Sequence, residues 1–151
     1  MINILVICTG NTCRSPMAEG IIRKLIADKK LDGISVSSMG LAAYYGDTAS
    51  TYSVDVMQEI EIDIQSHRSK RVLLKDLNEA NYIYVMTQQH KNVIVDACPE
   101  NECKIKVLDI PDPFGRDIEQ YRECRDALIA YFSKELEYII DEQKKEEQKN
   151  G

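Results

Sequence analysis

The fold is set by residues 2–16, which read Ile2-Asn3-Ile4-Leu5-Val6-Ile7-Cys8-Thr9-Gly10-Asn11-Thr12-Cys13-Arg14-Ser15-Pro16. Residues 2–7 are rich in β-branched side chains and lead into a glycine-containing turn, which predicts a buried strand. Ser15 followed by Pro16 is typical of a helix start, with Ser15 as the capping residue, and apolar residues then recur at helical spacing. The stretch therefore predicts a strand, a loop and a helix in that order.

The rest of the chain repeats this alternation. We expect strands over 34–38, 82–86 and 104–108, and helices from about 48–50 to Ile60, over 88–97 with Thr87 as its cap, and over 118–139 as one long helix or two short ones. Repeated strand–helix units with short connections favour right-handed crossovers and helices on both faces of the sheet. The prediction is an α/β fold with a four-stranded parallel sheet.

Length and charge limit what the chain can be. Its 151 residues suit one domain, 1–151, in which we expect 141–151 to form a frayed tail. A formal net charge of −6 argues against nucleic-acid partners and anionic membranes, both of which require a basic face. The first apolar run is shorter than a signal-peptide core and far shorter than a membrane span. We therefore expect a cytoplasmic protein with no membrane or nucleic-acid partner.

Five cysteines form an odd set, which argues against a structural disulfide framework. Cys98 and Cys103 have the spacing of a possible zinc-ligand pair, but no second pair accompanies them. We expect them, like Cys124, to be loop or packing residues, and we expect no metal and no cofactor.

The loop after the first strand has the chemistry of an anion site. Five residues separate Cys8 from Arg14, and Gly10 and Asn11 tolerate unusual backbone angles. The loop can therefore point its N–H groups at an oxyanion, with the positive end of the next helix behind them and the Arg14 guanidinium as a bidentate clamp. This field favours the nucleophilic thiolate of Cys8, and Ser15 is placed to hydrogen-bond the sulfur. A lone cysteine at a strand end is more often a small buried residue, but the complete pattern favours catalysis.

Residues 6–19 resemble the phosphate loop of low-molecular-weight protein tyrosine phosphatases, and Asp112-Pro113-Phe114 matches the Asp-Pro-aromatic segment of that family. The resemblance covers nearly the whole chain. It implies that the chain has the flavodoxin-like fold of these phosphatases. It also implies that the substrates are phosphorylated proteins. It also implies in-line attack by Cys8 on phosphorus, with Arg14 steadying the equatorial oxygens and Asp112 as acid and then base around a thiophosphate intermediate. Taken alone, Asp112 between two prolines would be read as a turn residue.

We expect the protein to be a monomer.

The resemblance also implies supporting roles. Asn11, Ser38 and His67 correspond to a hydrogen-bond network that holds the loop in shape, although His67 alone would be read as a solvated histidine. Cys13 could form a reversible disulfide with Cys8. His90 receives no role. The residues expected to bind substrate are Thr9, Gly10, Asn11, Thr12, Cys13, Ser15 and Phe114.

Thr12 bears on the substrate. Typical tyrosine phosphatases of the family have a bulky aliphatic residue there, whereas Asn11-Thr12-Cys13 together with 112–115 resembles the bacterial protein-arginine phosphatases. A small polar side chain leaves room and a hydrogen-bonding partner for a guanidinium, whose plane Phe114 could flank. We expect phosphoarginine as the substrate. Phosphotyrosine is the alternative, with Tyr44, Tyr45 and Phe114 as aromatic walls.

Two other functions are less well supported. Thioredoxin-coupled arsenate reductases have a similar loop, but they carry further cysteines just after the third strand, where this chain has Thr87-Gln88-Gln89-His90. A non-catalytic phosphoprotein-binding module would have no reason to keep both Cys8 and Asp112.

Overall fold

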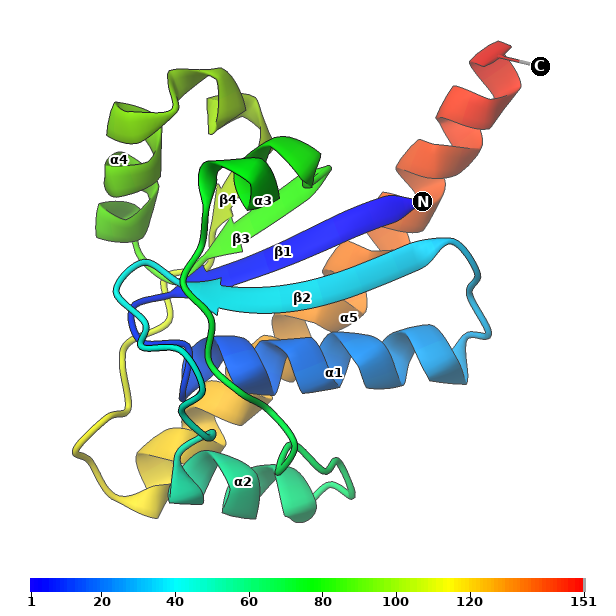
Figure 1. Cartoon of the computed structure of the whole chain (residues 1–151). Coiled ribbons are helices and arrows are strands. Elements are labelled where there is room, and N and C mark those ends of the chain that lie inside the picture. The colour runs from blue at the N-terminus through cyan, green and yellow to red at the C-terminus, as the bar shows by residue number, and fades with distance from the viewer. Residues whose placement is uncertain (151) are drawn as a thin grey trace.

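A parallel sheet forms the centre of the molecule in the computed structural model, which describes residues 1–150 (Figure 1). Its strands are β1 (Ile2–Cys8), β2 (Ile34–Gly40), β3 (Tyr82–Val85) and β4 (Ile105–Val107), in the order β2-β1-β3-β4. All three pairings are parallel, which confirms the predicted α/β fold. Because the chain moves from β1 to one side and then to the other, the carboxyl end of β1 lies at a topological switch point. Ligands bind at such points in open α/β sheets.

Helices cover both faces of the sheet, as predicted (Figure 1). One face carries α1 (Arg14–Asp28), α2 (Thr51–Gln58) and α5 (Ile118–Asn150); the other carries α3 (Leu74–Glu79), α4 (Gln88–Ala97) and the 3-10 helix η1 (Pro99–Lys104). Alternate residues of β1 supply the two cores, with Ile4 and Val6 in the first and Leu5 and Ile7 in the second. Burial on both faces explains why residues 4–7 of this strand form a continuous apolar run.

The start of α1 differs from the prediction. The helix begins at Arg14 with Cys13 as its N-cap residue, so Ser15 and Pro16 lie inside its first turn. Ser15 does not cap the helix because its hydroxyl lies 2.9 Å from Cys8 Sγ and accepts a hydrogen bond from Asn11. The Ser15 side chain therefore forms hydrogen bonds within the loop instead of capping α1.

The chain after Ile139 also differs from expectation. A single helix, α5, continues to Asn150, whereas a frayed tail was expected over 141–151; Gly151 lies outside the described residues. Contacts with β3 hold this part of α5 against the sheet, since the Tyr82 hydroxyl donates to Glu142 at 2.6 Å and accepts from Gln143. Within residues 1–150, no helix combines the length and apolar character needed to cross a bilayer.

Candidate active site

The segment between β1 and α1 wraps around a pocket of about 220 Å³. Cys8 lies at the end of β1, 3% exposed, and Asn11 adopts a φ of +57°, the left-handed conformation that asparagine tolerates well. This conformation curls the loop back toward Cys8. The pocket is lined by Cys8, Thr9, Gly10, Thr12, Cys13, Arg14, Asp112 and Phe114.

Arg14 is held where it can clamp an anion. Its side chain is almost completely buried, Nη1 donates to the carbonyl oxygen of Ile110 at 2.9 Å, and Nη2 lies 3.7 Å from Asp112 Oδ2. No side chain caps the start of α1, so the first N–H groups of the helix are open to a ligand. The structure thus brings Cys8, Arg14 and Asp112 to one pocket.

Asp112 and Phe114 lie on the loop between β4 and α5. Asp112 is about half exposed and accepts a hydrogen bond from the backbone N–H of Phe114 at 3.0 Å. The Phe114 ring is 73% exposed and stands at the rim of the pocket. A carboxylate held by one local turn and one long ion pair can approach a bound leaving group with little rearrangement.

Asn11 organises the loop from inside. Its Nδ2 donates to Ser15 at 2.8 Å and to Ser38 at 3.0 Å, while its Oδ1 accepts from the backbone N–H of Lys70 at 3.0 Å. Its carbonyl oxygen lies 2.7 Å from Nε2 of His67. The contacts expected among Asn11, Ser38 and His67 are therefore present in the structure. Because Ser15 accepts from Asn11, its own hydroxyl hydrogen is free to donate to the Cys8 sulfur.

Burial lowers the pKa of His67, outweighing the hydrogen bond to Asn11 that raises it, and this favours the neutral ring. A neutral ring with its hydrogen on Nε2 donates to the Asn11 carbonyl. It therefore holds the loop without adding a charge beside the anion site.

The cysteines have distinct surroundings, and within residues 1–150 all five are free thiols. Cys13 Sγ lies 3.4 Å from the hydroxyl of Ser50 and 3.6 Å from that of Tyr121. Burial raises the pKa of Cys124 to about 12, so this thiol stays protonated and unreactive. The disulfide between Cys13 and Cys8 remains a prediction.

Sequence reasoning missed His90. This residue is 8% exposed, and its Nε2 lies 2.8 Å from Oγ1 of Thr9 in the phosphate loop. A signal was available, because Thr87 caps α4 directly after β3, and the first turn of a helix that follows a parallel strand lies at the carboxyl edge of the sheet.

Gly40 is the position where β2 passes closest to the loop. A Cβ added there would lie 2.6 Å from the Thr9 carbonyl oxygen and 3.0 Å from the Asn11 nitrogen. We expect Gly40→Ala to lower the free energy of unfolding by about 1–3 kcal/mol and to reduce turnover, because the backbone of the loop must move. Thermal unfolding and steady-state kinetics on the same sample measure both effects.

Gly33→Ala is the matched control for this prediction. Gly33 has a φ of +78° and open space around its Cα, so alanine there strains the backbone without touching the loop. The control should lose stability and keep its turnover number. Equal turnover numbers in the two variants would show that Gly40 has no special relation to the loop.

The sheet and the anion loop at its switch point define a small enzyme of the phosphatase type. Comparison with protein-family models agrees, since residues 3–149 match the model of the low molecular weight phosphotyrosine protein phosphatase. The chain belongs to this family.

Individual relatives include both arginine and tyrosine phosphatases. A protein-arginine-phosphatase of Geobacillus stearothermophilus is 38% identical, with 93% of this chain and 97% of the relative covered. A low molecular weight protein-tyrosine-phosphatase of Staphylococcus haemolyticus is 35% identical over 87% of this chain and 95% of its own. The solved structure of the YwlE arginine phosphatase from Geobacillus stearothermophilus aligns with a TM-score of 0.87 at 36% identity, over 96% and 97% of the two chains.

Proposed function

We propose that this low-molecular-weight protein phosphatase hydrolyses phosphoarginine in proteins. The observation that carries the proposal is Thr12, a small polar residue that lines the pocket with Cys8 and Arg14. Its hydroxyl gives a guanidinium a hydrogen-bonding partner, and its size leaves space where a larger aliphatic side chain would fill the pocket. The similarity to a protein-arginine-phosphatase over most of both chains supports the same substrate.

The reaction follows from the positions of three side chains. The Cys8 thiolate attacks phosphorus, the P–N bond breaks, and Asp112 gives its proton to the leaving guanidine nitrogen. A thiophosphate on Cys8 remains. Asp112, now a carboxylate, takes a proton from water, which attacks phosphorus and releases inorganic phosphate with the Cys8 thiolate restored. Arg14 and the loop N–H groups neutralise the equatorial oxygens in both steps.

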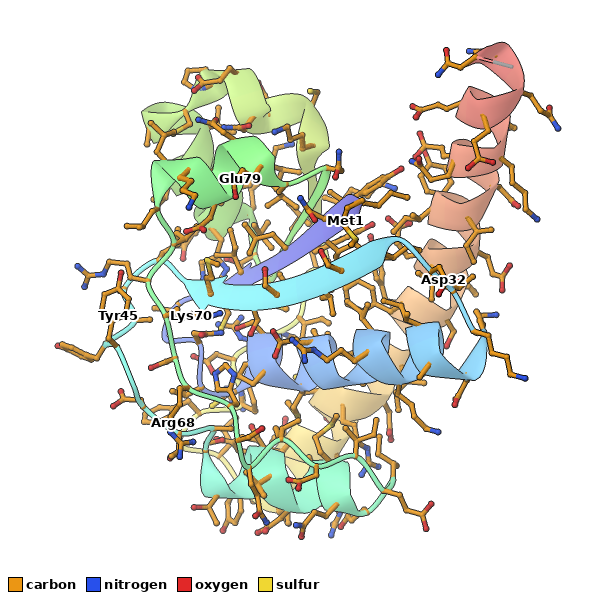
Figure 2. All side chains as sticks on the ribbon, turned by 45° about the vertical axis from the view of Figure 1, so that its right-hand side comes forward. Met1, Asp32, Tyr45, Arg68, Lys70 and Glu79 are labelled. Carbon is orange, nitrogen blue, oxygen red and sulfur yellow. The ribbon has the colours of Figure 1, made fainter. Side chains whose placement is uncertain are left out.

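Phosphotyrosine is the second candidate, and exposed aromatic side chains favour it. Tyr44 and Tyr45 are 75% and 67% exposed, and Tyr45 lies at the outer edge of the molecule on the same side as Lys70 (Figure 2). The Ser69 hydroxyl donates to the carbonyl oxygen of Tyr44, while Lys70 binds Asn11, so this segment is tied to the loop. Together with Phe114, these rings could stack on a phenyl group.

Exchange of Thr12 separates the two substrates. We expect Thr12→Ile to reduce kcat/KM for a phosphoarginine peptide by about 10–100-fold and to raise it for a phosphotyrosine peptide, because the pocket becomes narrower and apolar. The measurement is phosphate release from both peptides, without added metal, with Cys8→Ser as the blank.

Thr12→Val is the matched control, since it removes the hydroxyl and keeps the volume. It should lose phosphoarginine activity without gaining phosphotyrosine activity. A parent enzyme that prefers phosphotyrosine would keep the fold and the mechanism but overturn the proposed substrate.

An arsenate reductase would need to pass a disulfide from Cys8 to further cysteines. Cys98 is buried at the end of α4, in the core on the face of the sheet that α1 does not cover, and Cys103 lies in η1. Neither residue lines the pocket. This placement supports hydrolysis rather than a redox relay.

The remaining proposals concern the setting of the enzyme. Five free thiols suit the reducing cytoplasm, and the charge of −6 does not suit nucleic acid as a partner. We take the enzyme to be a monomer that acts on phosphorylated proteins. Sedimentation velocity tests this, and a concentration-independent dimer would overturn it.

A further inference from the structure

His90 approaches the phosphate loop from the side opposite to α1. It lies in the first turn of α4, where its backbone N–H donates to the capping hydroxyl of Thr87 at 3.3 Å. Helix α4 covers the other face of the sheet from α1 (Figure 1). The 2.8 Å contact between His90 Nε2 and Thr9 Oγ1 therefore connects the loop to a helix that packs in the other core of the molecule.

Thr9 is fixed at two points. Its carbonyl oxygen accepts a hydrogen bond from the backbone N–H of Ala42 at 2.9 Å, just after β2, and its hydroxyl meets His90 after β3. Thr9 directly follows Cys8 and lines the pocket. The position of the loop beside the nucleophile thus depends on segments from both neighbouring strands.

The hydrogen-bonding state of the ring follows from its other nitrogen. Nδ1 of His90 is buried and has no hydrogen-bond partner among residues 1–150. Orphaned N–H groups are rarer in protein interiors than unpaired acceptors, so Nδ1 is the nitrogen without hydrogen and Nε2–H donates to Thr9. Burial lowers the pKa of His90, and the charge of Arg14 lowers it further while that of Asp112 raises it, so the net shift favours the neutral ring.

This tautomer gives the Thr9 hydroxyl a defined direction. Because Thr9 Oγ1 accepts a hydrogen bond from His90, the hydroxyl hydrogen of Thr9 is free to point into the pocket. The hydroxyl hydrogen of Ser15 is free to donate to the Cys8 sulfur in the same way. We propose that His90 is a positioning residue for phosphoryl transfer: through Thr9 it fixes the start of the phosphate loop and turns the Thr9 hydroxyl into a donor for a phosphoryl oxygen. The inference rests on the proposed phosphatase activity but not on the choice of phosphoarginine.

The test combines four variants with two substrates, a phosphoarginine peptide and p-nitrophenyl phosphate. We expect His90→Leu to reduce kcat/KM about tenfold, mainly in kcat, since the loop donors must match the transition state. His90→Gln should recover most of the loss, because its side-chain N–H can replace Nε2–H. Thr9→Val should lose as much as His90→Leu, and the double variant Thr9→Val/His90→Leu should lose no more than either.

Ile94→Val is the matched control, since Ile94 is buried on the same helix away from the pocket. It should lower the melting temperature and leave kcat unchanged. Additive losses in the double variant, full activity of Thr9→Val, or a His90→Leu variant that loses only stability would each overturn the proposal. If His90→Leu fails to fold, Thr9→Val and His90→Gln still decide it.

The two substrates keep this proposal separate from the substrate assignment. Turnover of p-nitrophenyl phosphate reports on the loop whatever the natural substrate is. A parent enzyme that cleaves p-nitrophenyl phosphate but not the phosphoarginine peptide would overturn the proposed substrate and leave the role of His90 to be decided by the variants.

Discussion

Replacement of Cys8 by serine is expected to abolish phosphate release while leaving phosphate binding in place. The serine hydroxyl is a far weaker nucleophile than the thiolate, so turnover should fall by at least about a thousandfold. Arg14 and the loop N–H groups, which would bind the anion, are unchanged. Phosphate release gives the rate, and titration calorimetry with inorganic phosphate gives the binding.

Cys103→Ser is the matched control for this exchange. Cys103 is exposed in η1 and does not line the pocket, so its variant should keep full activity. Undiminished turnover in Cys8→Ser would overturn the whole mechanism, and loss of phosphate binding together with turnover would mean that the loop has collapsed.

Asp112→Asn should cause the second-largest loss, and its size should depend on the leaving group. General acid catalysis contributes about 10²–10⁴-fold, and an amide cannot supply it. Turnover of a phosphoarginine peptide should fall within that range. p-Nitrophenyl phosphate should lose much less, because p-nitrophenolate leaves without protonation. Steady-state kinetics on both substrates measure the difference.

Asp109→Asn tests whether another carboxylate of this loop can serve as the general acid. Asp109 precedes Asp112 by three residues, is exposed and has a φ of +58°, a conformation that asparagine tolerates. Its variant should remain active. Equal losses for the two leaving groups in Asp112→Asn would contradict the acid role and indicate a structural one, for example through the ion pair with Arg14.

The order of strands and helices could be predicted because hydrophobic periodicity reports directly on burial. The run at 2–7 and the helix over Gln88–Ala97, capped by Thr87, lie where the sequence placed them. Helix α3 and helix η1 were missed, since six residues are too few to show a period. The start of α1 was misplaced because the capping pattern of Ser15 does not reveal a competing contact with Cys8.

The candidate site divides in the same way. Cys8, Asn11 and Arg14 are neighbours in sequence, so their spacing alone indicates a loop around an anion. Asp112 and His67 were found only through the family resemblance. His90 lies 81 residues from Thr9. The Thr87 cap after β3 places His90 near the carboxyl edge of the sheet, but it does not show which residue the ring contacts. Such contacts depend on the twist and spacing of the strands, which periodicity does not encode.

The final turns of α5 leave the body of the molecule at the end away from the β1–α1 loop (Figure 1). Beyond the contacts of Glu142 and Gln143 with Tyr82, residues 144–150 are solvent-exposed. An enzyme immobilised or labelled through this helix would present its pocket away from the support. The helix is therefore a natural handle for a surface-based sensor in which large phosphoproteins must reach the enzyme unhindered.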